Sequence, residues 1–181
     1  SFWITEKVKA KKILFLAPSI SLLSQTLNVW LKISKNKNKN FFVVCSDNTA
    51  GMNDISEFTS DYDFPSTTNK KQISEFLNSH DELVIFSTYH SSKIVSKEAS
   101  NNNIVFDIVI CDEAHRLTGN VDEHYGTVLE EKFPVNKKLF MTATPRIISN
   151  GLKRAAEGRK INLVSMDDTK IFGDVIYELT L

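Results

Sequence analysis

Charge of one sign does not predominate in this sequence, because 22 lysine and arginine residues are balanced by 22 aspartate and glutamate residues. The net charge of zero at pH 7 excludes a strong overall basic field, so nucleic-acid binding has to be argued from local features. No apolar run approaches the roughly 20 residues that cross a bilayer, and the charged residues after Phe2-Trp3-Ile4 argue against a signal peptide. We therefore expect no membrane segment, and the 181 residues predict one domain with a sizeable core.

Cysteine is scarce as well, and this excludes a disulfide framework. The two cysteines, Cys45 and Cys111, both lie inside apolar runs of strand length. Residues of this kind are usually buried thiols. We therefore predict reduced thiols, a reducing compartment and a cytoplasmic protein.

Two motifs of metal and nucleotide chemistry are also missing. No H-E-x-x-H spacing occurs, and of the four histidines only His115 adjoins an acidic pair, which argues against a zinc hydrolase built from His80, His90, His115 and His124. The sequence contains no G-x-x-x-x-G-K-[ST] loop, the segment that cradles nucleotide phosphates in P-loop proteins.

Apolar runs of strand length alternate with segments of helical periodicity along the whole chain. The polar stretch 47–71 is predicted to be a long loop with one turn of helix. Five alternations of a predicted strand with a helical segment indicate an α/β fold with a doubly wound parallel sheet. The predicted strands are 13–17, 41–45, 83–87, 107–111 and 138–141, and the predicted helices are 2–10, 20–31 with Ser19 as N-cap, 73–77, a short one after 88–91, and 147–156 with Gly158 as a stop.

Polar residues with chemical potential follow two of these strands. Asp112 and Glu113 come directly after one strand, and Thr142 and Thr144 come after another about 30 residues later. Open α/β sheets place their ligand sites at this carboxyl edge. One carboxylate could hold Mg²⁺ and the second could orient or deprotonate an attacking water. By itself the acidic pair is more typical of a solvated turn, and its context favours function.

Two further segments at strand ends suit nucleic-acid backbone. Pro18 and Ser19 begin a helix with small hydroxyl side chains, which is a phosphate-binding arrangement. Thr88 and Tyr89 bring a hydroxyl and an aromatic ring to the end of another strand. The alternative for the first segment is an ordinary amphipathic helix capped by serine. Contacts of this neutral kind are compatible with zero net charge.

The motifs together resemble those of a known family. Asp112-Glu113-Ala114-His115 and the segment 141–145 resemble motifs II and III of superfamily 2 helicases of the DEAH-box type. Segments 17–26 and 87–91 resemble nucleic-acid motifs of the same family. The resemblance implies a RecA-like doubly wound sheet sandwiched by helices, lacking its first strand and P-loop, in a motor that uses ATP and Mg²⁺.

The resemblance also implies roles for individual residues. Asp112 would hold Mg²⁺, and Glu113 would position the attacking water. His115 would couple hydrolysis to movement through Thr142 and Thr144. The residues expected to contact nucleic-acid backbone are Pro18, Ser19, Gln25, Thr88 and Tyr89.

A narrower resemblance links the chain to the predicted helicases of restriction-modification enzymes. It rests on segments 16–26, 110–116 and 141–146 and on the tail 165–179. It implies a translocase on double-stranded DNA. We expect residues 1–165 to form a partial first motor domain and residues 166–181 to lead toward a second one.

The departures from the family pattern define a further expectation. The P-loop and the second RecA-like domain, with its arginine fingers, are not in this sequence. We expect this chain to be a fragment of a longer polypeptide and to be inactive as an ATPase alone. The alternatives are an RNA or DNA helicase outside restriction, and a nucleic-acid-binding or interaction module without ATPase activity.

Overall fold

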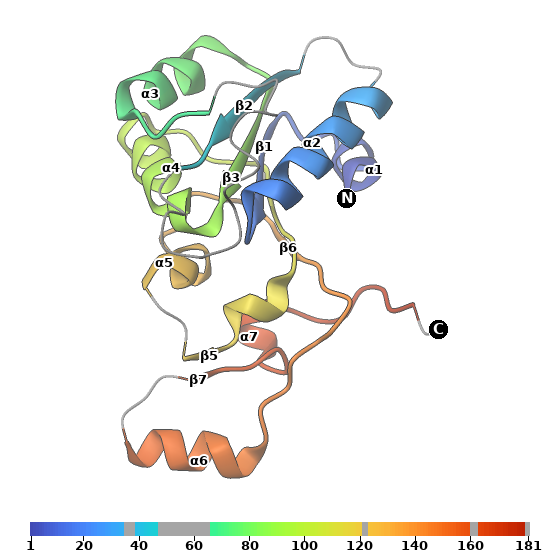
Figure 1. Cartoon of the computed structure of the whole chain (residues 1–181), viewed down its shortest axis with the longest axis vertical. Helices are drawn as coiled ribbons and strands as arrows, with labels where there is room; N and C mark the ends of the chain where they lie inside the picture. Colours follow the sequence, from blue (N-terminus) through green and yellow to red (C-terminus); the bar gives the residue numbers. More distant parts are fainter. Residues whose placement is uncertain (35–38, 47–65, 121–122, 160–162, 180–181) are drawn as a thin grey trace.

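A parallel sheet forms the centre of the molecule (Figure 1). The computed structural model describes residues 1–34, 39–46, 66–120, 123–159 and 163–179. The sheet has five strands in the order β2-β3-β1-β4-β6, all paired in parallel. This confirms the predicted doubly wound sheet, and each strand lies within one residue of its predicted bounds. The strands are β1 (Lys12–Ala17), β2 (Asn40–Val44), β3 (Leu83–Thr88), β4 (Ile108–Cys111) and β6 (Lys138–Phe140).

Helices cover both faces of the sheet. On one face, α1 (Phe2–Lys7) and α2 (Ile20–Ile33) bury Phe2, Leu23, Leu27 and Trp30 in what we call the α2-side core. On the other face, α3 (Lys70–Ser79) and α4 (Tyr89–Asn101) bury Ile73, Leu77, Tyr89 and Val95 in the α4-side core.

Strand β1 shows why the strands are continuous apolar runs. Ile13 and Phe15 point into the α2-side core, whereas Leu14 and Leu16 point into the α4-side core. Because successive side chains of a strand point to opposite faces, a strand covered on both faces has to be apolar at every position. The start of β1 is tied to β4 by the carboxylate of Asp107, which accepts hydrogen bonds from the backbone N–H groups of Lys11 and Lys12 at 2.8 and 2.9 Å.

Short elements lie below the sheet in Figure 1 and were not predicted. Strands β5 (Gly119–Asn120) and β7 (Leu163–Val164) form a two-stranded antiparallel sheet. The remaining elements are the 3₁₀ turns Ala114–Leu117 and Thr127–Leu129 and the helices α5 (Glu123–Gly126) and α7 (Thr169–Phe172).

The predicted helix at 147–156 is wrong at both ends. Helix α6 spans Asn150–Gly158, so it begins three residues later, and Gly158 is its last residue rather than a stop beyond it. The backbone before it is held by the 163–166 segment: Ile148 N–H donates to Ser165 Oγ at 2.9 Å, and Met166 N–H donates to the Arg146 carbonyl at 3.2 Å. These tertiary bonds replace the helical bonds that the local periodicity favoured.

Two other predictions need correction. Helix α4 has 13 residues and is not short. Helix α3 begins at Lys70, inside the predicted loop 47–71, because Asn69 caps it by accepting a hydrogen bond from Lys71 N–H at 3.0 Å. Residues 47–65 of that loop lie outside the described residues.

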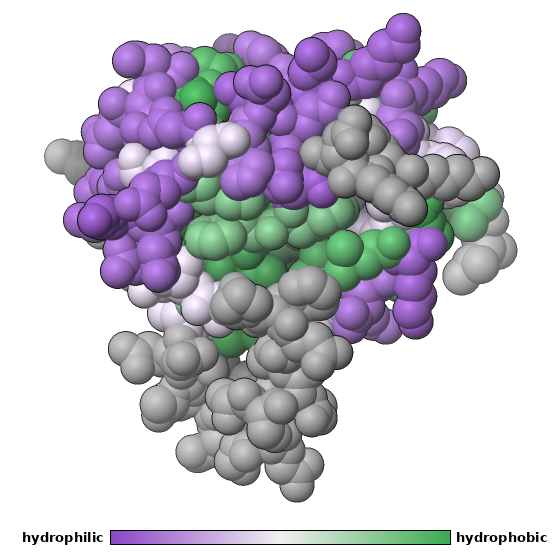
Figure 2. Space-filling view, turned by 90° about the horizontal axis from the view of Figure 1, so that it is seen from above, coloured by the Kyte–Doolittle hydropathy of each residue, from purple (hydrophilic) through white to green (hydrophobic). Residues whose placement is uncertain are grey.

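The two cysteines lie in the interior, as the sequence predicted. Cys45 and Cys111 are both buried, and Cys111 is a free thiol. Burial raises the pKa of Cys111 to about 12, which keeps it protonated and unreactive. Viewed from above, a strip of hydrophobic surface has hydrophilic side chains along its upper border and on both sides (Figure 2). Within the described part of the chain, no helix is long and apolar enough to cross a membrane.

Candidate functional site

The carboxyl ends of the strands place the predicted motifs along one edge of the sheet. In the strand register Ala17 pairs with Thr88, Leu16 with Cys111, and Cys111 with Phe140. The polar segments that follow these strands therefore begin side by side. The sheet thus brings together the acidic turn, which we define as Asp112 and Glu113, and the hydroxyl segment, which we define as Thr142–Thr144.

The acidic turn is held by backbone hydrogen bonds to both neighbouring strands. Asp112 N–H donates to the Leu16 carbonyl at 2.9 Å, and Ala114 N–H donates to the Met141 carbonyl at 2.8 Å. Between them Glu113 adopts a left-handed conformation with φ of 50°. This conformation costs an L-residue about 1–2 kcal/mol, and it persists only where the surrounding contacts impose it. The left-handed conformation of Glu113 turns the chain sharply out of β4.

Asp112 is half-buried at the end of β4. Burial raises the pKa of its carboxyl above the usual value, the hydrogen bond from Glu113 N–H (3.1 Å to Oδ1) opposes this, and the nearby Glu113 charge adds to the increase. Among the described residues no group of three or more His, Cys, Asp or Glu side chains could enclose a metal ion. Mg²⁺ keeps several waters and needs only one or two protein carboxylates, so Asp112 fits a hydrated Mg²⁺ but not a zinc site.

His115 joins the acidic turn to the hydroxyl segment. Its Nδ1 lies 3.0 Å from Thr142 Oγ1, 3.3 Å from Thr144 Oγ1 and 3.2 Å from Glu113 Oε2. A protonated ring nitrogen donates its hydrogen to one good acceptor at a time, so these three oxygens compete for it. His115 can therefore exchange its partner between the glutamate and the threonines. This is the arrangement expected of a group that links two motifs.

The β3–α4 junction lies against the acidic turn. Thr88 caps α4, since its Oγ1 accepts a hydrogen bond from Ser91 N–H at 3.4 Å. Tyr89 is fully buried, its ring stacks on Tyr125 at 5.3 Å, and its hydroxyl donates to the Asp112 carbonyl at 2.8 Å. Burial is the main cause that raises the pKa of Tyr89, so the hydroxyl remains a donor. The structure thus places the predicted nucleic-acid residue Tyr89 inside the protein, with its hydroxyl on the acidic turn.

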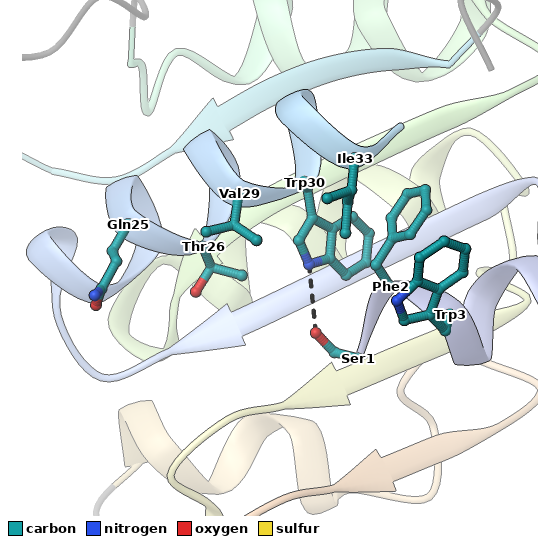
Figure 3. A pocket seen from close by; sticks show the side chains of 8 residues that line it. All are labelled: Ser1, Phe2, Trp3, Gln25, Thr26, Val29, Trp30 and Ile33. Carbon is teal, nitrogen blue, oxygen red and sulfur yellow. Dashed lines mark hydrogen bonds between the residues drawn. The ribbon is translucent and has the colours of Figure 1, made fainter. Parts of the chain in front are cut away.

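The remaining predicted nucleic-acid residues lie around the start of α2. Ser19 caps the helix as predicted, with Oγ accepting from Leu22 N–H at 3.3 Å, and Pro18 precedes it. Gln25 is exposed and lines a groove between α1 and α2 (Figure 3). No residue of the acidic turn or the hydroxyl segment lines this groove, in which Trp30 Nε1–H donates to Ser1 Oγ at 3.3 Å.

Sequence reasoning missed some supporting residues. Thr118 had no role assigned, and its hydroxyl donates to the His115 carbonyl at 2.6 Å, which holds the turn that carries the histidine. A threonine three residues after the histidine was the available signal. Tyr125 supports Tyr89 by stacking, and nothing in the local sequence indicated this contact.

Comparison with known proteins gives relatives of one kind. The protein "Probable helicase A859L" of African swine fever virus (isolate Pig/Kenya/KEN-50/1950) is 30% identical over 172 residues, which cover 94% of this chain and 17% of the viral protein. The same protein from strain Badajoz 1971 Vero-adapted is 29% identical over 171 residues, with the same coverage of both chains. The chain therefore spans less than a fifth of these relatives.

Similar solved structures include restriction-modification enzymes and a helicase domain. The Type ISP restriction-modification enzyme LlaGI, solved as a nuclease-deletion mutant with a DNA substrate mimic, aligns with a TM-score of 0.73 and 30% identity over 97% of this chain and 14% of that one. The ATP-dependent Type ISP enzyme LlaBIII bound to DNA aligns at 0.75 and 30%, over 98% of this chain and 12% of that one. The Hef helicase domain of Pyrococcus furiosus, at 0.51 and 15% over 94% and 34%, supports the RecA-like helicase fold alone.

A family model identifies the chain. The model described as "Type III restriction enzyme, res subunit" matches residues 2–147, which include the acidic turn and the hydroxyl segment. The match covers most of the sequence and agrees with the restriction enzymes among the structural neighbours. The chain belongs to the family of the Type III restriction enzyme res subunit, with the RecA-like fold of superfamily 2 helicases.

Proposed function

We propose that this chain forms part of the first motor domain of an ATP-dependent DNA translocase of the restriction-modification type. The observation that carries the proposal is the position of His115 Nδ1, within 3.3 Å of Glu113, Thr142 and Thr144. A motor has to connect the group that activates water to a segment that can move. His115 makes this connection between Glu113 of the acidic turn and the hydroxyl segment. The names of the neighbours, which include DNA-bound restriction enzymes, support DNA as the partner.

The residues of the acidic turn take separate parts in this proposal. Asp112 would hold Mg²⁺ through its waters, and Glu113, with its carboxylate half-exposed, would orient the attacking water and accept its proton. Bound Mg²⁺ would neutralise the charge that develops on the phosphates of ATP. His115 would sense the reaction through Glu113 and pass the change to Thr142 and Thr144.

The nucleic-acid contacts and the domain limits also remain proposals. We infer that backbone phosphates lie along the starts of α2 and α4, near the predicted contacts Pro18, Ser19, Gln25, Thr88 and Tyr89. Double-stranded DNA is the proposed substrate. Residues 1–165 would belong to the motor domain, and residues 166–181 would lead toward a second RecA-like domain. A reducing compartment such as the cytoplasm fits the buried Cys111 thiol.

The test is ATP hydrolysis by the parent polypeptide, measured with and without duplex DNA. We expect duplex DNA to stimulate the wild type and Glu113→Gln to lose at least about 100-fold in kcat, because glutamine cannot accept the proton. The matched control is Glu131→Gln, at an exposed glutamate outside the site, which should retain wild-type turnover. Single-stranded DNA and RNA in parallel assays would identify the preferred substrate.

Two outcomes would contradict the proposal. Equal turnover by the Glu113→Gln and wild-type polypeptides would remove the assigned role of Glu113. Absence of turnover in a folded wild-type polypeptide that still binds DNA would favour a binding module without ATPase activity. The isolated 181-residue chain is expected to show no ATP hydrolysis, and turnover by it that Asp112→Ala abolishes would contradict that expectation.

A further inference from the structure

The hydroxyl of Tyr89 makes a contact across the sheet. Tyr89 follows β3, and Asp112 follows β4, yet these strands are not neighbours, because β1 lies between them. The hydroxyl donates to the backbone carbonyl of Asp112 at 2.8 Å. The side chain therefore spans the end of β1 and connects the β3–α4 junction directly to the acidic turn.

The acceptor of this bond is part of the peptide group that leads into Glu113. That peptide has a carbonyl from Asp112 and an N–H from Glu113, and the N–H donates to Asp112 Oδ1 at 3.1 Å. The next peptide group is held by Ala114 N–H on the Met141 carbonyl and by Arg116 N–H on the Glu113 carbonyl, at 2.8 and 3.0 Å. Both peptides beside the left-handed Glu113 are thus fixed, and Tyr89 supplies the bond to the carbonyl of the first.

The surroundings of Tyr89 make this bond a rigid one. The side chain is fully buried, packs in the α4-side core and stacks on Tyr125 at 5.3 Å. The hydroxyl donates to the Asp112 carbonyl and also interacts with the buried Cys111 thiol, so this phenol with its fixed ring has little freedom to leave the acidic turn. A direct contact between this side chain and nucleic acid would require the ring to leave the core.

We propose that Tyr89 is a positioning residue that orients the Asp112–Glu113 peptide, and through it the Glu113 carboxylate that activates the attacking water. This inference rests on the proposed function. It gives the Tyr89 side chain a role inside the site in place of a direct nucleic-acid contact. It also connects the start of α4, one of the proposed phosphate contacts, to the peptide that leads into Glu113 through the hydrogen bond to the Asp112 carbonyl.

The experiment uses Tyr89→Phe in the parent polypeptide, with Tyr177→Phe as a matched control at a side chain that is 78% exposed. We expect Tyr89→Phe to lower kcat for ATP on the order of 10-fold, because the glutamate loses its orientation. The KM for ATP and the Kd for duplex DNA should stay within about twofold of wild type, since a positioning residue touches neither ligand. Tyr177→Phe should leave all three unchanged.

A double-mutant cycle with Glu113→Gln separates positioning from general support of the fold. If Tyr89 acts through Glu113, Tyr89→Phe should cause no further loss in the Glu113→Gln background. A further loss of the same size in that background would overturn the proposal. So would a weaker Kd for DNA with unchanged kcat, which would identify Tyr89 as a nucleic-acid contact.

Hydrogen exchange gives a readout that does not depend on ATPase activity. In the parent polypeptide, Tyr89→Phe should accelerate exchange of the amides of residues 113 and 114 while those of β1 and β3 remain protected. Unchanged exchange at 113 and 114 would overturn the proposal even in an active enzyme. If the wild type has no ATPase activity, the proposed function fails. Faster exchange in Tyr89→Phe would then show that the hydrogen bond is purely structural. That result would also overturn the positioning role.

Discussion

At the scale of single residues, the half-buried carboxylate of Asp112 lowers the stability of the fold when it is charged. Burial raises the pKa of its carboxyl, so the folded state favours the protonated form more than the unfolded state does. The stabilising contribution of this group is fully present below the unfolded pKa of about 3.9, and it is lost as the pH rises through the raised folded value. At neutral pH the charged Asp112 therefore destabilises the fold.

We therefore expect Asp112→Asn to stabilise the isolated chain at pH 7. The amide oxygen can still accept the hydrogen bond from Glu113 N–H, and the half-buried charge is removed. The gain should be roughly 0.5 kcal/mol, a value reduced for solvent screening. Urea unfolding at pH 7 and pH 4 would measure it. The gain should shrink at pH 4, and Asp174→Asn, at an exposed aspartate, should show no gain.

At the scale of elements, an aromatic cluster packs α1 against the sheet. Trp30 of α2 lies 5.2 Å from Phe2 of α1, 5.9 Å from Phe15 of β1 and 5.4 Å from Phe86 of β3, measured between ring centroids. All three pairs have edge-to-face geometry, which adds to the free energy of burial. The indole therefore holds two helices and two strands together.

The chain contains a matched pair of tryptophans that tests this role. Trp30 is 2% exposed and Trp3 is 67% exposed. Trp30→Ala should lower the free energy of unfolding by about 3–5 kcal/mol, because it removes a large buried side chain and leaves a cavity. Trp3→Ala should change it by less than about 0.5 kcal/mol. Urea unfolding of the isolated chain measures both, and a loss for Trp30→Ala as small as that expected for Trp3→Ala would show that the α2-side core does not depend on Trp30.

At the scale of the whole molecule, the C-terminal segment divides by packing. Met166 and Phe172 pack against the α4-side core, and the Phe172 ring lies 4.9 Å from that of Phe140. Farther along, Val175 and Ile176 are about four-fifths exposed, at 82% and 79%. The first part of the segment belongs to the fold of this chain, whereas the second makes no comparable contribution to the core.

This division predicts how the isolated chain tolerates shortening. A chain that ends at Gly173 should unfold within about 0.5 kcal/mol of the full chain, since the side chains of residues 174–179 are exposed. A chain that ends at Ser165 should lose roughly 2 kcal/mol or more, because Met166 and Phe172 no longer cover the core. Thermal or urea unfolding of the two chains provides the measurement. Equal stability of both would show that α7 adds nothing to the fold.

The sequence by itself determined the features that depend on local patterns. The five strands were predictable because parallel strands buried on both faces are unbroken apolar runs, and Ser19 was predictable as a cap because its hydroxyl bonds three residues ahead. The proximity of the acidic turn and the hydroxyl segment also followed, since both come directly after strands of one parallel sheet. The resemblance then supplied roles that no periodicity could indicate.

Only the tertiary structure decided the contacts that join distant segments. The order β3-β1-β4 places Tyr89 against the Asp112 carbonyl, and this order cannot be read from strand periodicity. The backbone of 146–148 bonds to residues near 165, which delays the start of a helix that the local pattern favoured at 147. The left-handed Glu113 is likewise imposed by bonds from strands on both sides. Local propensities amount to less than about 1 kcal/mol per residue, so a few tertiary hydrogen bonds and buried side chains outweigh them.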